Sequence, residues 1–174
     1  AMVWQWLYQP QFGLFNYLLD LLGLPRLPWL TSPATALPSI MLMTIWMSIG
    51  YQMVIFLAGL QGIPTYLYEA AIIDGASPWQ RFRHITLPLL KPTTFFVLVT
   101  AVIGSFQVFT SVYVMTAGGP ARATDVVVYH IYQNAWEYLR MGYASAMAWV
   151  LFLIIMLATY VQFRLVGRGV EYGH

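Results

Sequence analysis

The chain has 174 residues, of which 60% are hydrophobic and only 8% carry a charge. Ordinary soluble domains contain about 25% charged residues, so this composition predicts an integral membrane protein. A net charge of +2 with scattered basic residues excludes an extended nucleic-acid-binding surface, and the absence of cysteine excludes disulfides and thiolate metal sites.

Residues 1–36 are rich in aromatic side chains, which are Trp4, Trp6, Tyr8, Phe12, Phe15 and Tyr17. Aromatic rings of this kind gather at the membrane interface, where one edge is wet and one face is apolar. We therefore expect an outer-face interfacial segment. Within it, a short helix is predicted from Phe12 to Leu22, closed by Gly23 and Pro25.

Three long uncharged runs follow. Each is long enough to cross about 30 Å of hydrocarbon as a helix, and none shows the alternation of about ten residues that marks a barrel strand. The prediction is an all-α fold with three transmembrane helices at 37–60, 93–116 and 144–163.

Basic residues near the span ends set the orientation. Five of them (Arg81, Arg83, Lys91, Arg164 and Arg168) flank one side, and three (Arg26, Arg122 and Arg140) flank the other. The positive-inside rule therefore places segment 61–92 and the tail 164–174 in the cytoplasm. It places 1–36 and 117–143 outside, the latter as a turn at "AGGP" (117–120) followed by a short helix, against the strand propensity of Val126 to Val128.

The polar insert 61–92 reads as a helix-turn-helix. Pro64 suits a first helical position and Gly75 a left-handed helix end, which predicts a helix at 64–74. Ser77 and Gln80 have the spacing of a capping box, which predicts a second short helix from Ser77 to about Thr86. Pro88 and Pro92 should prevent its simple continuation into the next span.

The insert reads "EAAIIDGASPWQRFRHITLPLLKP" from residue 69 to residue 92. Glu-Ala-Ala, Gly75 and Ile-Thr-Leu-Pro stand at the intervals of the EAA loop of ABC importer permeases, which this segment resembles. The stretches "LAGLQGIP" and "VMTAGGP" are similar to the maltose and glycerol-phosphate group of carbohydrate importers. The resemblance runs from about Phe12 to Phe163.

This resemblance implies a transport subunit of a prokaryotic cytoplasmic (inner) membrane. Its expected partners are an ATP-binding cassette subunit, a second permease subunit, an extracytoplasmic solute-binding protein near the outer region, and membrane lipid. The residues that it assigns to coupling with the ATP-binding subunit are Glu69, Ala70, Ala71, Asp74, Gly75, Ile85, Leu87 and Pro88. The transported molecule would be a sugar or sugar derivative.

The chain should not be an enzyme, and no cofactor is expected. It has no G-x-x-x-x-G-K-[ST] loop for ATP, and its single lysine, Lys91, stands between Leu90 and Pro92. The three histidines lie outside the predicted spans, which leaves a membrane protease without a base. Asp125 and His130 are five residues apart and should not share a helix face, so no metal site is predicted.

Polar side chains inside spans mark a possible substrate path, because they are costly in lipid. The candidates are Gln52, Gln107, Thr110, Ser111 and Tyr113, with Tyr51, Ser105 and the aromatic rings of Phe106 and Phe109 nearby in sequence. Two alternatives stay open. The Gln107 amide could instead make an interhelical hydrogen bond, and Ser and Thr hydroxyls can bond to their own helix.

Permeases of the group that the chain resembles usually have about six spans, and this chain has three predicted ones. Three helices cannot readily enclose an aqueous path for a sugar, since their polar faces would meet lipid. We therefore expect the chain by itself to be inactive in transport. The competing hypothesis is a structural membrane adaptor derived from such a permease.

Overall fold

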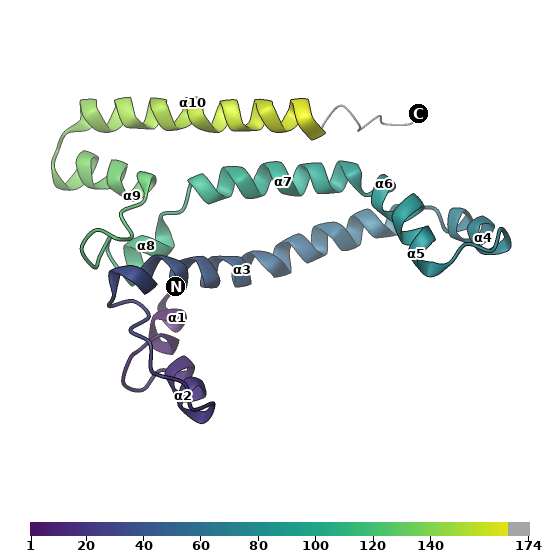
Figure 1. Cartoon of the computed structure of the whole chain (residues 1–174). Coiled ribbons are helices and arrows are strands. Elements are labelled where there is room, and N and C mark those ends of the chain that lie inside the picture. Colours follow the sequence, from purple (N-terminus) through teal and green to yellow (C-terminus); the bar gives the residue numbers. More distant parts are fainter. Residues whose placement is uncertain (167–174) are drawn as a thin grey trace. The chain divides into compact units, whose positions relative to one another are not determined.

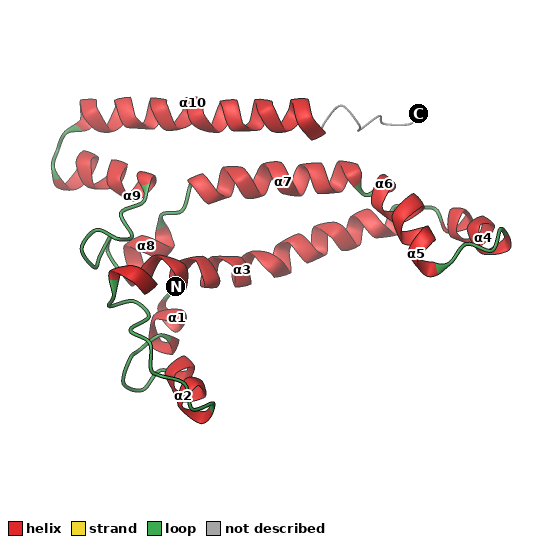
Figure 2. Cartoon of the chain, in the orientation of Figure 1, coloured by secondary structure: helices red, strands yellow, loops and turns green. Residues whose placement is uncertain are grey.

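The computed structural model describes residues 1–166, and all regular structure in that range is helical (Figure 2). The all-α prediction is confirmed at this level. Figure 1 labels the α-helices in chain order, and two π-helical turns, η1 and η2, lie among them. The elements are α1 (Met2–Leu7), α2 (Leu14–Leu21), α3 (Pro33–Gln61), α4 (Thr65–Ile73), α5 (Pro78–Arg81), η1 (Phe82–Thr86), α6 (Leu87–Leu89), α7 (Lys91–Phe106), α8 (Thr110–Met115), α9 (Val127–Tyr132), η2 (Gln133–Glu137) and α10 (Met141–Val166).

Two helices are long and apolar enough to cross a membrane. α3 has 29 residues and contains the predicted span 37–60, and α10 has 26 residues and contains the predicted span 144–163. Large apolar side chains stand exposed on both, including Trp46 at 68% and Trp149 at 67%. Exposure of this kind on a long apolar helix suits contact with lipid.

The prediction of one continuous helix over 93–116 is wrong. α7 ends at Phe106, the Gln107 N–H donates to the Gly104 carbonyl three residues back at 3.1 Å, and Phe109 has a non-helical backbone before α8 begins. The break turns Val108 and Phe109 against the aromatic core of their own unit, and that packing outweighs the helical pattern of the sequence. α7 reaches span length only together with Pro78–Leu89, which meets it at a bend of 61°, so the described residues hold two to three candidate spans.

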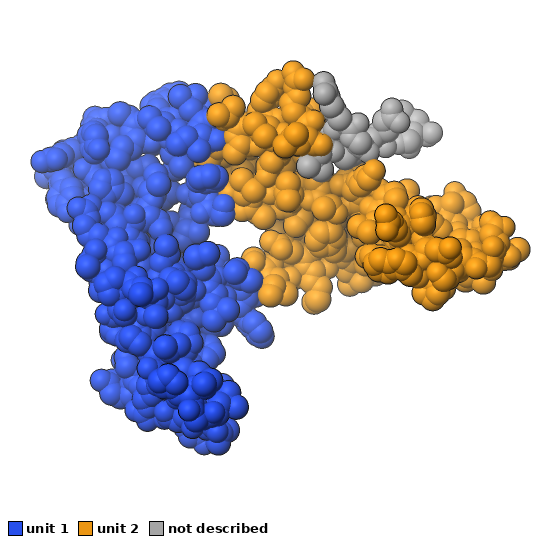
Figure 3. All heavy atoms as spheres, in the orientation of Figure 1, with its two compact units in different colours: residues 1–47, 104–154 blue, residues 48–103, 155–174 orange. Residues whose placement is uncertain are grey.

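The chain forms two compact units, coloured separately in Figure 3. Unit 1 comprises 1–47 and 104–154, and unit 2 comprises 48–103 and 155–174. Both segments predicted on the outer side, 1–36 and 117–143, fall in unit 1, and the polar insert falls in unit 2. Most of the predicted cytoplasmic tail, from 167 to 174, lies outside the described residues.

The core of unit 1 is built around Tyr8, which has no exposed surface and packs with Ile40, Met43, Val112, Met115 and Tyr129. Its hydroxyl donates to the Ser39 carbonyl at 2.8 Å. Burial raises the pKa of Tyr8 to about 12, so the hydroxyl keeps the proton that it donates. Trp4 and Phe15 pack against the same core. These three rings therefore stabilise the unit, while Trp6, Phe12 and Tyr17 remain exposed. The interfacial role of the segment stays a prediction.

Asn16 fixes the N-terminal segment on this core. Its side chain is only 2% exposed, and its amide donates to the carbonyls of Pro10 and Leu27 at 3.0 Å each. Its oxygen accepts from the Leu27 N–H and from the Trp29 indole. α2 is about one turn shorter than predicted and ends at Leu21. Gly23 follows the cap residue Leu22 with a positive φ of 70°, as the sequence suggested.

In unit 2, α3 and α7 approach closely at Gly59. A Cβ atom placed there would lie 2.5 Å from Thr93 Oγ1 and 3.1 Å from Leu90 Cδ2. Glycine at this position lets the two helices pack near the point where both meet the polar insert.

Candidate functional site

The hairpin, residues 64–90, begins with α4. Pro64 is extended (ψ 131°) and serves as N-cap, so the helix starts at Thr65, one residue later than predicted. Glu69 and Ala70 are exposed and Ala71 is half-buried. The acid and the small residues of the EAA pattern thus leave a carboxylate and a stretch of accessible backbone on one short helix.

Gly75 ends α4 in the predicted left-handed conformation, with φ +79°. The Gly75 N–H donates to the Ile72 carbonyl at 3.0 Å, and the Ala76 N–H donates to the Ala71 carbonyl at 2.9 Å. These two bonds are a Schellman motif, which satisfies the last carbonyls of the helix. Side chains with a Cβ are strained at this φ, so glycine fixes the turn.

The capping box of the second arm is confirmed. The Gln80 N–H donates to Ser77 Oγ at 3.3 Å, and the Ser77 N–H donates to Gln80 Oε1 at 2.7 Å. Pro78 occupies the first turn of α5, where its missing N–H costs little.

The second arm runs to Leu89, beyond its predicted end at about Thr86, and the prediction that it does not continue simply into the next span is confirmed. The helical chain widens into the π-turn η1, in which the Leu87 N–H bonds to the Phe82 carbonyl, and then runs through Pro88 to Leu89. Because the π-turn has already shifted the ladder away from i→i−4 pairing, the missing N–H of Pro88 falls where little is lost. The bend comes after Leu89.

A hydrogen bond between the Tyr68 hydroxyl and Thr86 Oγ1, at 2.8 Å, joins the two arms. Thr86 is buried, with 8% of its surface exposed. Together with the Schellman turn, this bond holds the hairpin as one piece. Sequence reasoning missed the pair, because two hydroxyls 18 residues apart give no local signal.

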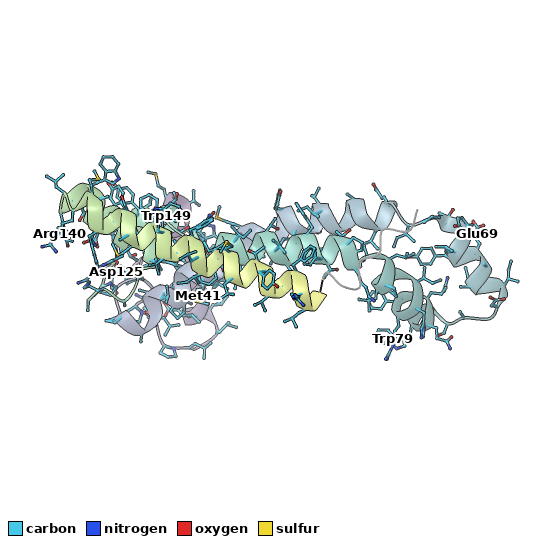
Figure 4. All side chains as sticks on the ribbon, turned by 90° about the horizontal axis from the view of Figure 1, so that it is seen from above. Met41, Glu69, Trp79, Asp125, Arg140 and Trp149 are labelled. Atoms are coloured by element: carbon cyan, nitrogen blue, oxygen red, sulfur yellow. The ribbon has the colours of Figure 1, made fainter. Side chains whose placement is uncertain are left out.

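Several large side chains of the hairpin face outward. Ile73 is 86% exposed and Trp79 66%, and the Trp79 ring stacks on Phe82 with centroids 5.6 Å apart. Figure 4 shows Glu69 and Trp79 standing out from the ribbon. Leu87 and Pro88 are also exposed and Ile85 is half-buried. Outward apolar groups beside a carboxylate are typical of a protein-docking surface.

Between the arms lies a cavity of about 370 Å³. It is lined by Ala71, Asp74, Gly75, Ala76, Gln80, Arg81, His84 and Ile85. Four of the residues assigned to coupling from the sequence (Ala71, Asp74, Gly75 and Ile85) therefore share one hollow. Arg81 was not among the predicted site residues, although it contributes the guanidinium of this cavity.

The residues predicted for a substrate path are divided between the units. Gln52, half-buried, belongs to unit 2, whereas Gln107, Thr110, Ser111 and Tyr113 belong to unit 1. The Tyr113 ring stacks on Phe109 at 5.4 Å and meets Tyr132 at 5.4 Å. Exposed Gln107 lies in the break between α7 and α8. The structure thus gathers aromatic rings around Tyr113, and the path itself stays a prediction.

The side chains of Asp125 and His130 are in contact, although their spacing predicted that they would not share a helix face. Asp125 precedes the helix α9, so its Oδ2 reaches both His130 Nδ1 at 3.0 Å and Arg122 Nη2 at 2.7 Å. Burial alone would raise the pKa of Asp125, but hydrogen bonds and charge attraction from Arg122 and His130 outweigh burial and lower it. Within residues 1–166 no group of three or more His, Cys, Asp or Glu side chains could hold a metal ion.

The chain is similar to known transport proteins. Residues 2–172 match the family model of the binding-protein-dependent transport system inner membrane component. A probable ABC transporter permease protein of Brucella suis is 41% identical over 171 residues, covering 97% of this chain and 59% of that protein. The trehalose/maltose transport system permease protein MalF of Thermococcus litoralis is 39% identical, covering 97% of this chain and 56% of its own length.

A solved structure is similar as well. The crystal structure of a bacterial alginate ABC transporter in complex with its alginate pentasaccharide-bound periplasmic protein matches 99% of this chain and 62% of the aligned chain. The TM-score is 0.85 and the identity is 26%. The chain thus spans little more than half the length of the proteins it matches. From a match over almost its full length, we conclude that the chain belongs to the binding-protein-dependent transport system inner membrane component family, the permeases of ABC transporters.

Proposed function

We propose that this chain is part of a permease that imports a sugar or sugar derivative, and that the hairpin couples it to an ATP-binding subunit. The observation that carries the coupling role is the hairpin itself. It is a short helix pair held by a Schellman turn, a capping box and the Tyr68–Thr86 bond, and it exposes Glu69 and apolar side chains.

A hairpin of this kind can act as a rigid lever. A hairpin whose arms are bonded to each other transmits a push without bending internally, and α6 continues into α7 through a single bend. On the partner, a basic group would pair with the Glu69 carboxylate in a charge-assisted bond, and a groove would receive the backbone beside Ala70 and Ala71. ATP-driven movement of that partner would then tilt the attached helices.

The substrate class and the remaining partners rest on relatives. The relative from Thermococcus litoralis is named for trehalose and maltose, and the solved transporter for alginate, with a periplasmic protein bound. By that likeness the substrate is a carbohydrate delivered by a solute-binding protein to the outer face. Gln107 and the rings of Phe109 and Tyr113 are the proposed contacts of unit 1, and a second permease subunit would complete the path. The hairpin and the tail are proposed to be cytoplasmic.

The alternative is a transport-inactive structural adaptor. An adaptor would keep the helices but would not need a docking-competent hairpin.

The test is capture of the cognate ATP-binding subunit in detergent by three forms of the chain. Gly75→Val should lower capture at least tenfold, because a β-branched residue is strained at φ +79°. Gly75→Asn should keep most of it, since asparagine tolerates the left-handed region. Equal capture by the wild type and by Gly75→Val would count against the coupling role, and no capture by the wild type would favour the adaptor.

A further inference from the structure

The cavity between the arms of the hairpin contains an unsatisfied charge. Arg81 lines it, and the Arg81 Nε atom is buried without a hydrogen-bond partner in residues 1–166. A guanidinium stays protonated at any physiological pH and offers five N–H donors. A buried donor left unpaired is costly, so this arrangement is expected to gain an acceptor in the assembled state.

The neighbouring groups do not supply one. Asp74 lines the same cavity, but among the described residues no ion pair joins it to Arg81. The Gln80 carbonyl is 3.0 Å from His84 Nδ1 and accepts from it. The Gln80 side-chain oxygen is used by the capping box. Among the described residues, no group that lines the cavity therefore accepts a hydrogen bond from the Arg81 Nε atom.

The charge of the second arm specifies the acceptor. From 75 to 92 the sequence contains Arg81, Arg83 and Lys91 and no acidic residue. Guanidinium pairs best with a carboxylate, in two parallel N–H···O bonds. A cavity of about 370 Å³ has room for the end of an acidic side chain.

A carboxylate carried by a protein fits better than a free anion. Asp74 in the same cavity repels any anion, and a small anion that arrives alone brings no other contact to offset that repulsion. A side chain on a docking partner is instead delivered together with the apolar contacts of Ile73 and Trp79, which are largely exposed on the same hairpin. We infer that this cavity receives an Asp or Glu side chain of the ATP-binding subunit, with Arg81 as its ion-pair partner. This inference rests on the proposed docking function.

The hairpin would then present two opposite charges to its partner. Glu69 on α4 would pair with a basic side chain of the partner, and Arg81 on α5 would pair with an acidic one. Such a pair fixes the direction in which the partner lies across the hairpin, because a reversed orientation would place like charges together.

The test is the affinity of the detergent-solubilised chain for the ATP-binding subunit, measured for four forms. Arg81→Gln should weaken binding about 10-fold to 100-fold, since it removes one member of a buried charge pair. Arg83→Gln is the matched control, because it removes the same charge only two residues away. The Arg83 side chain is exposed and does not line the cavity. Arg83→Gln should change affinity less than about threefold. The affinity of Arg81→Lys should lie between those of Arg81→Gln and the wild type. Lysine keeps the positive charge but cannot donate two parallel N–H bonds to one carboxylate.

The outcomes separate the two proposals. If the wild type does not bind at all, the docking function fails. If the wild type binds and Arg81→Gln binds equally well, or if Arg81→Gln and Arg83→Gln lose affinity equally, the specific pair is overturned and docking stands. Weakened attachment of Arg81→Gln to vesicles containing anionic lipid, with unchanged partner affinity, would assign the cavity to a lipid headgroup and overturn the inference. Positive support comes from an Arg81→Glu variant whose binding is restored by an Asp→Arg or Glu→Arg change on the partner.

Discussion

At the scale of single residues, a few buried polar groups hold the structure. Asn16 uses both its amide hydrogens and its oxygen, and Asp125 joins Arg122 and His130 through one oxygen. Neither was recognised from the sequence, because an asparagine or aspartate in a loop has the same local pattern whether it is buried or solvated. What decides is where the chain brings the carbonyls and N–H groups that these side chains meet.

Asn16→Ala should lower the free energy of unfolding by about 2–4 kcal/mol, since four hydrogen bonds worth about 1 kcal/mol each are lost in a buried site. The measurement is denaturant or thermal unfolding in detergent, followed by tryptophan fluorescence because Trp29 donates to Asn16. Gln11→Ala, at an exposed amide of the same segment, is the control and should stay within about 0.5 kcal/mol of the wild type. Equal effects would mean that Asn16 is not a structural centre.

The loop that contains Asp125 should be sensitive to acid. Its folded pKa lies below its ordinary value of about 3.9. The stabilisation is therefore fully present above that value and is lost as the pH falls through the folded pKa. Asp125→Asn should be less stable than the wild type near neutral pH, and the difference should shrink below about pH 4. Hydrogen exchange of the α9 amides across this range measures it, and a difference that persists unchanged in acid would refute the assignment.

At the scale of elements, the sequence predicted where helices begin and end at turns, but it did not predict whether a long helix stays continuous. Gly23, Gly75 and the Ser77–Gln80 box ended or began helices as predicted, because each acts through its own backbone. The run 93–116 broke at 107–109, and the arm that begins at Pro78 passed through Pro88, because packing and a π-turn overrode propensity. The contact at Gly59 was likewise invisible, since it depends on a second helix.

Gly59 and Gly50 offer a matched pair in α3. Replacing a mid-helix glycine by alanine favours the helix by about 1 kcal/mol. At Gly50 nothing lies within 4 Å, so Gly50→Ala should be neutral or stabilising. At Gly59 the added methyl group would meet stiff Thr93, so Gly59→Ala should be destabilising by about 1–2 kcal/mol net. Thermal unfolding of this chain in detergent measures both stability changes. A stability change of the same sign in both variants would refute close helix packing at Gly59.

At the scale of the whole molecule, composition established a helical membrane protein and the EAA spacing indicated its family, which the match over residues 2–172 confirmed. Both signals are carried by the residues themselves, since apolar length and motif intervals do not depend on tertiary contacts. The three-span topology with 1–36 and 117–143 outside stays a prediction. Whether the hairpin docks on an ATP-binding subunit is what the Gly75 variants test.

By itself, the sequence determined the helical class, the family, and the local turns of the hairpin, because these follow from apolar runs, motif spacing and the φ that glycine allows. Only the tertiary structure decided that Tyr8 is a core residue, that Tyr68 and Thr86 bond across the hairpin, and that Arg81 lines the cavity with its Nε atom unpaired among the described residues. Each of these depends on which distant residues the fold brings within a few ångströms, and burial and pairing energies act only at that range.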